Sequence, residues 1–305
     1  MSNLFKPRYL SPRYWHTWLT FGLLRLVIWL PRRWRYVIGS ALGSLLYYLI
    51  PSRRHVAEVN VRLCFPDMDD DERRQMVKDV FRQNGTGIIE SGMAWWTPTH
   101  ELAGKIRVVG AEHLQAAHDA GQGVVLMGSH FTVLDMGALL MNSFTELDCF
   151  YRPHNNPLFD ALVEQGRSRH VERQIAHWDM RTLVRRLSAG KIVWFAPDQD
   201  RGPKPSVYAP FFGVSAATVT ATARIAKLGN ARVIPVAFHR LPDHSYEVEL
   251  FPALENFPSG DDVADATAVN LAQERAIRKY PTQYMWVHRR FKTHPKGKNY
   301  LYRQG

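Results

Sequence analysis

The sequence predicts an α/β protein with a central, mostly parallel sheet covered by helices and an N-terminal membrane helix. Short apolar runs that end in polar or Gly-containing sequence alternate with longer segments of helical periodicity, and this alternation predicts the sheet and its covering helices. Three of the apolar runs lead directly into sequence rich in His, Arg or Asp. The membrane helix is predicted from an apolar and aromatic run near the N-terminus that basic residues flank on both sides.

The N-terminal segment is predicted to bind a membrane. Residues 14–30 form an apolar run that only His16 and Arg25 interrupt, and a second apolar run over residues 37–50 ends at Pro51. The first run is short for a bilayer span, which needs about 20 residues, so a single span and a helix lying in the interface both stay open. An amphipathic core helix is the alternative. No small-residue cleavage site is visible, which argues against a removed signal peptide.

After this segment, helices and strands are expected to alternate. An acidic N-cap sequence at residues 67–72 precedes a long predicted helix over residues 72–95. Further helices are expected at residues 112–120, from Leu134 onward, and at residues 158–169, 180–189, 214–228 and 263–280. Strands are expected at residues 106–109, 124–127, 147–151, 191–196, 233–239 and 246–251.

The 305 residues are enough for one large domain, and no linker rich in Gly, Ser or Pro divides the middle of the chain. We therefore expect a membrane anchor over residues 1–52 and one catalytic domain over residues 53–305. The formal charge is +11, but the basic residues are dispersed and no recognition motif for nucleic acid is present. Anionic lipid or an acidic protein is thus the expected partner. Cys64 and Cys149 lie in apolar sequence, which favours buried thiols in a reducing compartment.

His130 is the predicted catalytic base. It follows the strand expected at residues 124–127 and stands five residues before Asp135. The carboxyl end of a strand is the usual place for chemistry in an α/β sheet. An imidazole can take a proton from a hydroxyl group, and a carboxylate can fix its tautomer. We therefore predict that His130 and Asp135 act together, although most pairs with this spacing in proteins are incidental.

Two more predicted strands end in polar sequence, at Arg152-Pro-His-Asn155-Asn156 and at Pro197-Asp198-Gln-Asp200. If the strands are parallel, these loops share one edge of the sheet with His130. Arg152 could clamp a phosphate or carboxylate group, or form a structural ion pair. Asp198 and Asp200 could orient Arg152, bind a metal or cap a turn.

Two alternative functions stay open, a glycosyltransferase and a non-catalytic membrane scaffold that binds lipid without turnover. Asp198-x-Asp200 matches the short acidic motif of metal-dependent glycosyltransferases, so a membrane-associated glycosyltransferase is the second hypothesis. No serine-hydrolase elbow, phosphate-binding loop or dinucleotide fingerprint is present in the sequence. Residues 284–292 combine aromatic residues with Arg289, Arg290 and Lys292, which indicates a site for anionic headgroups or a solvated basic strand end.

Together these residues resemble the late acyltransferases of lipid A biosynthesis in Gram-negative bacteria, above all those that transfer a lauroyl chain. A phosphate-binding segment of the Glu-Gly-Thr-Arg kind, which glycerophospholipid acyltransferases carry, is absent from the sequence. The resemblance covers nearly the whole chain and depends on six segments: Leu63-Cys-Phe-Pro66, Glu90-Ser-Gly-Met-Ala-Trp95, His130 with Asp135, Tyr151-Arg-Pro-His-Asn-Asn-Pro157, Ala196-Pro-Asp-Gln-Asp200 and Tyr284-Met-Trp-Val-His-Arg-Arg-Phe-Lys292.

The resemblance implies a fold like that of glycerol-3-phosphate acyltransferases, in an enzyme of the bacterial inner membrane whose active site faces the cytoplasm. Such enzymes move a fatty acyl chain from acyl carrier protein to the hydroxyl of a 3-hydroxyacyl chain on a Kdo-bearing lipid A precursor. The expected partners are therefore acyl carrier protein, the Kdo2-lipid A precursor and inner-membrane lipids. Acyl carrier protein serves as co-substrate, and no cofactor and no metal are expected because a thioester is already activated.

The resemblance also implies roles for particular residues. His130 and Asp135 match the catalytic pair. Arg152 and Asp198 match positions expected at the active site. The complete set of predicted substrate-binding residues is Arg152, Asn155, Asp198, Asp200, Arg289, Arg290 and Lys292.

Overall fold

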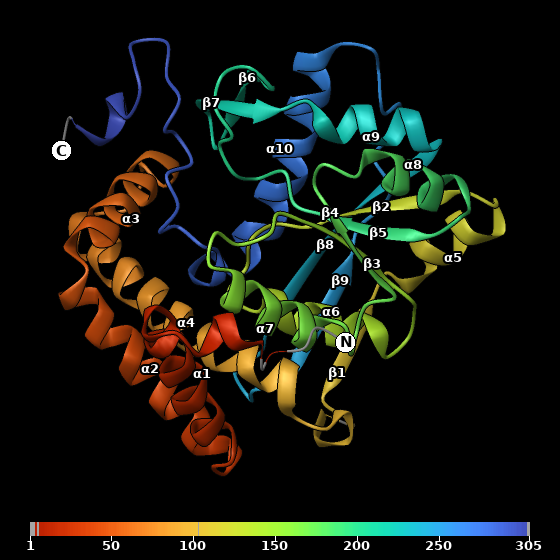
Figure 1. The fold of residues 1–305 in the computed structure, drawn as a ribbon. Helices are drawn as coiled ribbons and strands as arrows, with labels where there is room; N and C mark the ends of the chain where they lie inside the picture. The colour runs from red at the N-terminus through yellow and green to blue at the C-terminus, as the bar shows by residue number, and fades with distance from the viewer. Residues whose placement is uncertain (1–3, 5, 103, 304–305) are drawn as a thin grey trace.

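The computed structural model describes residues 4, 6–102 and 104–303 (Figure 1). Its α-helices are α1 (Trp15–Ile28), α2 (Arg32–Leu49), α3 (Pro51–Cys64), α4 (Asp70–Trp96), α5 (Ala111–Asp119), α6 (Leu134–Asn142), α7 (Pro157–Arg167), α8 (Met180–Ser188), α9 (Ala221–Gly229) and α10 (Asp262–Lys279). Its strands are β1 (Ile106–Val109), β2 (Gly123–Met127), β3 (Asp148–Tyr151), β4 (Arg173–Ala176), β5 (Ile192–Phe195), β6 (Ser206–Phe211), β7 (Val214–Val219), β8 (Ala231–Arg240) and β9 (Tyr246–Leu250).

A seven-stranded sheet with the order β1-β9-β8-β2-β5-β3-β4 forms the centre of the molecule. Every neighbouring pair in it is parallel except β8 and β9, which are antiparallel. The predicted α/β class with a mostly parallel sheet is therefore confirmed. Because β2, β5 and β3 are consecutive and parallel, the loops that follow them leave the sheet at one edge.

Helices cover both faces of this sheet (Figure 1). Strand β2 shows why, since all five of its residues are buried and successive side chains point to opposite faces. Val124 and Leu126 belong to the core that includes α4 and α6. Val125 and Met127 belong to a second core with α8 and α9. An apolar strand that is buried on both faces is typical of parallel sheets.

The long helix α4 begins at an acidic capping box, close to where the sequence predicts it. Asp69 accepts hydrogen bonds from the N–H groups of Asp71 and Glu72, and the Glu72 side chain accepts from the Asp69 N–H. Helix α2 packs directly along α4, because a Cβ atom at Gly85 would lie only 2.3 Å from the Gly43 nitrogen. Residues 15–52 are thus packed onto the rest of the chain, and the boundary at residue 52 stays a prediction.

The expectation of a membrane-spanning N-terminal helix is not supported. Helix α1 has 14 residues and ends at Ile28, and Pro31 followed by Arg32 starts the separate helix α2. In the part of the chain that the structure describes, no helix combines the length and the apolar character that a bilayer span requires.

The helix predicted at residues 214–228 is wrong over its first half. Residues Val214–Val219 form β7, which pairs with β6 as an antiparallel hairpin outside the main sheet. The turn residues Phe212 and Gly213 both have positive φ, the geometry that a two-residue hairpin turn requires. Small residues such as Ala216 and Ala217 gave a helical pattern, but burial against neighbouring elements decides the conformation. The short strand β4 was also not predicted.

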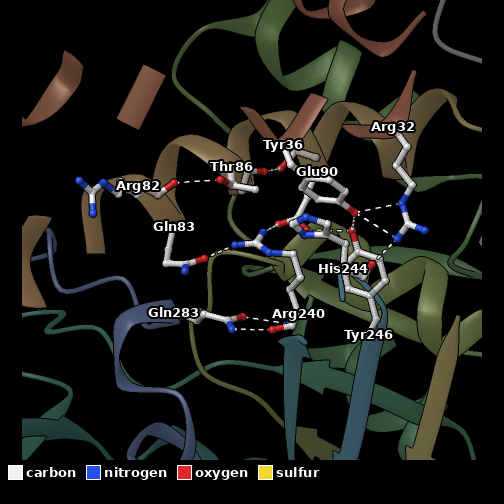
Figure 2. Close-up of polar contacts among 12 residues, drawn as sticks. Arg32, Tyr36, Arg82, Gln83, Thr86, Glu90, Arg240, His244, Tyr246 and Gln283 are labelled. Carbon is white, nitrogen blue, oxygen red and sulfur yellow. Dashed lines mark hydrogen bonds and ion pairs between the residues drawn. The ribbon is translucent and has the colours of Figure 1, made fainter. Parts of the chain in front are cut away.

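A buried ion pair ties α4 to the sheet (Figure 2). Glu90 of α4 has no exposed surface, and its carboxylate accepts hydrogen bonds from Arg240 Nη1 at 2.6 Å and from the Tyr246 hydroxyl at 2.8 Å. Tyr36 of α2 lies 2.9 Å from Tyr246, between the two hydroxyl oxygens. Burial raises the pKa of Glu90, and the Arg240 guanidinium opposes that rise. The contacts join helices α2 and α4 to strands β8 and β9.

We predict that Glu90→Ala lowers the free energy of unfolding by about 3–5 kcal/mol, because it leaves the Arg240 charge buried and unpaired. Denaturant unfolding followed by circular dichroism measures this. The matched control is Glu146→Ala, whose side chain is 72% exposed in its ion pair with Lys191; it should cost about 0–1 kcal/mol. Equal losses in the two variants would contradict the structural role given to Glu90.

Candidate active site

The imidazole of His130 is held by Asp198. His130 lies in the loop after β2, and Asp198 lies in the loop after the neighbouring strand β5. The His130 Nδ1 atom is 2.6 Å from Asp198 Oδ1, and the His130 backbone N–H donates to Asp198 Oδ2 at 3.0 Å. The His130 side chain keeps 18% of its surface exposed, whereas Asp198 keeps 1%. The Asp198 carboxylate thus fixes both the backbone and the ring of His130.

Asp198 is ionised in the folded protein. Burial acts to raise the pKa of Asp198, but the His130 charge and the two hydrogen bonds from His130 outweigh it and lower the pKa to about 2. The Tyr284 hydroxyl donates a third hydrogen bond to Asp198 at 3.0 Å. Because an ionised carboxylate only accepts hydrogen bonds, the Nδ1 atom of His130 carries the proton, and Nε2 carries the free electron pair of the neutral ring.

The predicted contact between His130 and Asp135 is not present, and this corrects the sequence interpretation. Asp135 lies in the first turn of α6, where its carboxylate accepts a hydrogen bond from Arg167 Nε at 2.6 Å. Burial acts to lower the pKa of Arg167, but Asp135, together with Cys149 and Tyr151, outweighs burial and raises that pKa, so the guanidinium stays charged. Sequence analysis missed Arg167, because an Arg in the last turn of a helix usually interacts with the helix terminus.

A narrow, mostly apolar cavity lies beside these groups. The Trp194 ring lines it and lies 6.4 Å from the His130 ring, centroid to centroid. Asp135 and Arg167 give the cavity one charged pair. The other lining residues are Leu134, Ala138, Leu147, Cys149, Val171 and Phe238. Cys64 and Cys149 are buried, free thiols, as predicted.

The C-terminal segment around residues 283–285 is hydrogen-bonded to the loop that carries His130. The Thr132 N–H donates to the Gln283 carbonyl at 2.8 Å, and the Met285 N–H donates to the His130 carbonyl at 3.0 Å. The Gln283 side chain makes two further hydrogen bonds with the backbone of Arg240, at 2.9 and 2.8 Å (Figure 2). The loop that carries the predicted base is therefore connected to the buried ion pair of Glu90.

Two predicted substrate-binding residues have internal roles instead. Arg290 is 1% exposed, and it donates to the Ala217 carbonyl, to Thr218 and to Asn270. Asp200 is 2% exposed and accepts hydrogen bonds from Gly202 and Thr293. Direct contact of either side chain with a substrate is incompatible with this burial. Asp198 and Asp200 also serve separate partners, so they do not share the ligand geometry that a glycosyltransferase metal motif requires.

The remaining predicted residues lie at or near the surface. Arg152 and Asn155 are exposed in the loop after β3, and β3 neighbours β5. Lys292 donates to the Asp200 carbonyl at 3.0 Å. Exposed Arg289 lies over the Tyr302 ring, 5.9 Å from its centroid. Within the described ranges, no cluster of three or more His, Cys, Asp or Glu side chains has the arrangement of a metal site.

Comparison with known proteins identifies the family. Residues 3–293 match the model of the bacterial lipid A biosynthesis acyltransferases. The chain belongs to this family. The lipid A biosynthesis lauroyltransferase of Escherichia coli (strain K12) is 38% identical over 301 residues, which cover 97% of this chain and 98% of that protein. The palmitoleoyltransferase of the same organism is 36% identical, with 98% of each chain covered.

The resemblance seen in the sequence is therefore confirmed, and the protein is an acyltransferase. The Escherichia coli (strain K12) myristoyltransferase is 25% identical over 303 residues, covering 98% of this chain and 94% of its own. A solved 1-acyl-sn-glycerophosphate acyltransferase from Thermotoga maritima has a TM-score of 0.37 and 13% identity over 82% of this chain and 99% of its own. That similarity is too low to test the expected glycerol-3-phosphate acyltransferase-like fold.

We predict that Tyr284→Phe lowers the free energy of unfolding by about 1.5–3 kcal/mol, because the buried Asp198 carboxylate loses one of its donors. Thermal and denaturant unfolding measure the loss. The control is Tyr208→Phe, since Tyr208 is 41% exposed and its change should cost less than about 0.5 kcal/mol. A Tyr284→Phe variant as stable as the control would show that the hydrogen bond to Asp198 contributes little.

Proposed function

We propose that this protein transfers a fatty acyl chain from acyl carrier protein to the hydroxyl of a 3-hydroxyacyl chain on a Kdo-bearing lipid A precursor. The observation that carries the proposal is the His130–Asp198 pair, with 2.6 Å between Nδ1 and Oδ1, at the carboxyl edge of the sheet in a member of this family. The glycosyltransferase alternative is not favoured, because the relatives are named acyltransferases.

In the proposed mechanism, His130 Nε2 accepts the proton of the acceptor hydroxyl as its oxygen attacks the thioester carbonyl. Asp198 holds Nδ1–H and stabilises the imidazolium that forms. The tetrahedral intermediate then collapses, the carbon–sulfur bond breaks, and His130 returns the proton to the departing thiolate. The products are an ester and the free thiol of the carrier. Asp135 acts in this scheme through Arg167, not through His130.

The acyl chain is proposed to enter the apolar cavity beside Trp194. Its mostly apolar lining suits a hydrocarbon chain, and the charged Asp135–Arg167 pair gives the cavity a polar side. The relatives are named for lauroyl, palmitoleoyl and myristoyl transfer, so similarity alone leaves the chain length open. The formal charge of +11 suits an acidic carrier protein, whose docking should weaken as salt is added.

We also propose that α1 and α2 lie on the inner membrane, with the active site on its cytoplasmic face. Trp15, Leu19, Leu23 and Leu26 recur at helical spacing on α1 and are each at least 54% exposed. A second exposed stripe runs along α2: Trp34, Val37, Leu45 and Tyr48. Stripes of this kind, flanked by arginines, are typical of helices that lie in the membrane interface.

We predict that His130→Ala lowers turnover by about 10²–10⁴-fold, the usual contribution of a general base. Mass spectrometry would follow a tetra-acylated, Kdo-bearing lipid A precursor incubated with carrier protein that bears a lauroyl, myristoyl or palmitoleoyl chain. The control is His118→Ala, on the exposed face of α5. Normal turnover in a folded His130→Ala variant would exclude His130 as the base, and no product from the wild type with any donor would refute the proposed reaction.

The membrane proposal predicts that the double variant Trp15→Asp, Leu19→Asp binds vesicles containing phosphatidylglycerol roughly tenfold or more weakly, because it loses apolar surface buried in the interface. Co-sedimentation with the vesicles measures the binding. Leu271→Asp is the control, since Leu271 is 56% exposed and belongs to α10, a helix that lies away from α1 in the fold (Figure 1). If both proteins bind as the wild type does, α1 is not the membrane contact.

A further inference from the structure

Two arginines at the carboxyl edge of the sheet form no ion pair with an acidic side chain in the part of the chain that the structure describes. Arg152 follows β3 directly, and Arg201 follows β5 after the turn at residues 197–200. The two strands are neighbours and run parallel, so both residues leave the sheet on the edge that carries His130. Both are exposed, and neither takes part in the ion pairs formed within the described residues.

The nearby carboxylates are already in use. Asp198 is engaged by His130 and Tyr284, and Asp200 by Thr293, Gly202 and Lys292. Partial burial and the neighbouring charge of Arg152 both lower the pKa of Arg201. The two guanidinium groups therefore repel each other, and the charge of Asp198, which His130 and Tyr284 already engage, offsets this only in part. An arrangement of this kind costs folding energy unless an anion binds between the two groups.

The backbone that carries Arg201 is fixed in advance. Asp200 Oδ1 accepts the Gly202 N–H at 2.9 Å, and Asp200 Oδ2 accepts the Thr293 N–H at 2.6 Å. Gly202 has a φ of +96°, which only glycine adopts readily. Because the turn is already ordered, Arg201 would lose little entropy other than that of its own side chain when it binds a ligand.

We propose that Arg152 and Arg201 together bind a phosphate group on the headgroup of the acceptor lipid. Each planar guanidinium can donate two parallel hydrogen bonds to phosphate oxygens, and a pair of them matches the charge of a phosphate monoester. The site adjoins the predicted base, since Asp198 contacts His130 and stands three residues before Arg201 in the same loop.

The position of this site favours a lipid over the carrier protein. Asn156, in the loop that carries Arg152, donates from Nδ2 to Thr17 Oγ1 of α1 at 2.9 Å. Phe21 of α1 packs edge-on against Phe159 of α7 at 5.4 Å between ring centroids. Arg152 therefore lies beside the helix whose outer stripe is proposed to contact the membrane. This inference rests on the proposed function and identifies which group of the acceptor is recognised.

The test compares two acceptors, the phosphorylated lipid A precursor and the same lipid after enzymatic removal of its phosphates. Initial rates with saturating acyl carrier protein would be measured for the wild type, Arg201→Gln, Arg152→Gln and the control Arg169→Gln. Arg169 is an exposed arginine between α7 and β4, at the opposite edge of the sheet. We expect KM for the phosphorylated lipid to rise roughly tenfold or more in the two site variants, the size expected for lost charged hydrogen bonds, with kcat nearly unchanged.

With the dephosphorylated lipid, the two site variants should match the wild type, and Arg169→Gln should behave as the wild type throughout. Unchanged KM values, or equal losses with both lipids, would overturn the phosphate site. A rise in KM for the acyl carrier protein alone would assign the arginines to the donor and overturn the lipid assignment.

Direct binding keeps the test separate from the proposed reaction. Fluorescence titration of both lipids with the wild type and Arg201→Gln needs no turnover. A preference of the wild type for the phosphorylated lipid that Arg201→Gln loses supports the site even if no acyl product forms. Equal binding of both lipids by the wild type refutes it, even if acyl transfer is observed.

Discussion

The buried carboxylate of Asp198 is the contact on which the geometry of the site depends. It accepts hydrogen bonds from the backbone and ring of His130 and from the Tyr284 hydroxyl. Removing a carboxylate from water costs several kcal/mol, and these three donors, each in a charge-assisted hydrogen bond to the ionised carboxylate, offset the cost. The same hydrogen bonds hold the loop after β2, the loop after β5 and the C-terminal segment at fixed positions relative to one another.

A second buried carboxylate, that of Glu90, is connected to the same region. Glu90 holds Arg240, and Gln283 pairs with the Arg240 backbone while its carbonyl accepts the Thr132 N–H. These hydrogen bonds therefore link helix α4 to the loop of His130 through strand β8. We infer that this connection keeps the loop of His130 rigid, while the apolar outer faces of α1 and α2 remain exposed.

Local sequence signals predicted much of the fold. The capping box of α4 and the apolar run of β2 are determined by nearby residues, so the helix and the strand were found at their correct places. The hairpin of β6 and β7 was not predicted, because its conformation depends on packing against α10 that no local pattern reports. The convergence of the loops after β2, β5 and β3 followed from parallel order alone, since that order determines the edge at which each loop leaves.

The pairing of side chains within the site was beyond sequence reasoning. A His-x4-Asp spacing specifies that two residues are near in the chain, but it does not specify the direction in which each side chain points. Asp135 starts a helix and points toward Arg167 of α7, whereas Asp198, distant in sequence, arrives through the neighbouring strand. Because the two carboxylates then have different partners, one can hold the imidazole while the other keeps a permanent cation beside the apolar cavity. The His130 ring and the Arg167 guanidinium therefore each have a carboxylate of their own, and the two acids reach the site from segments that follow different strands.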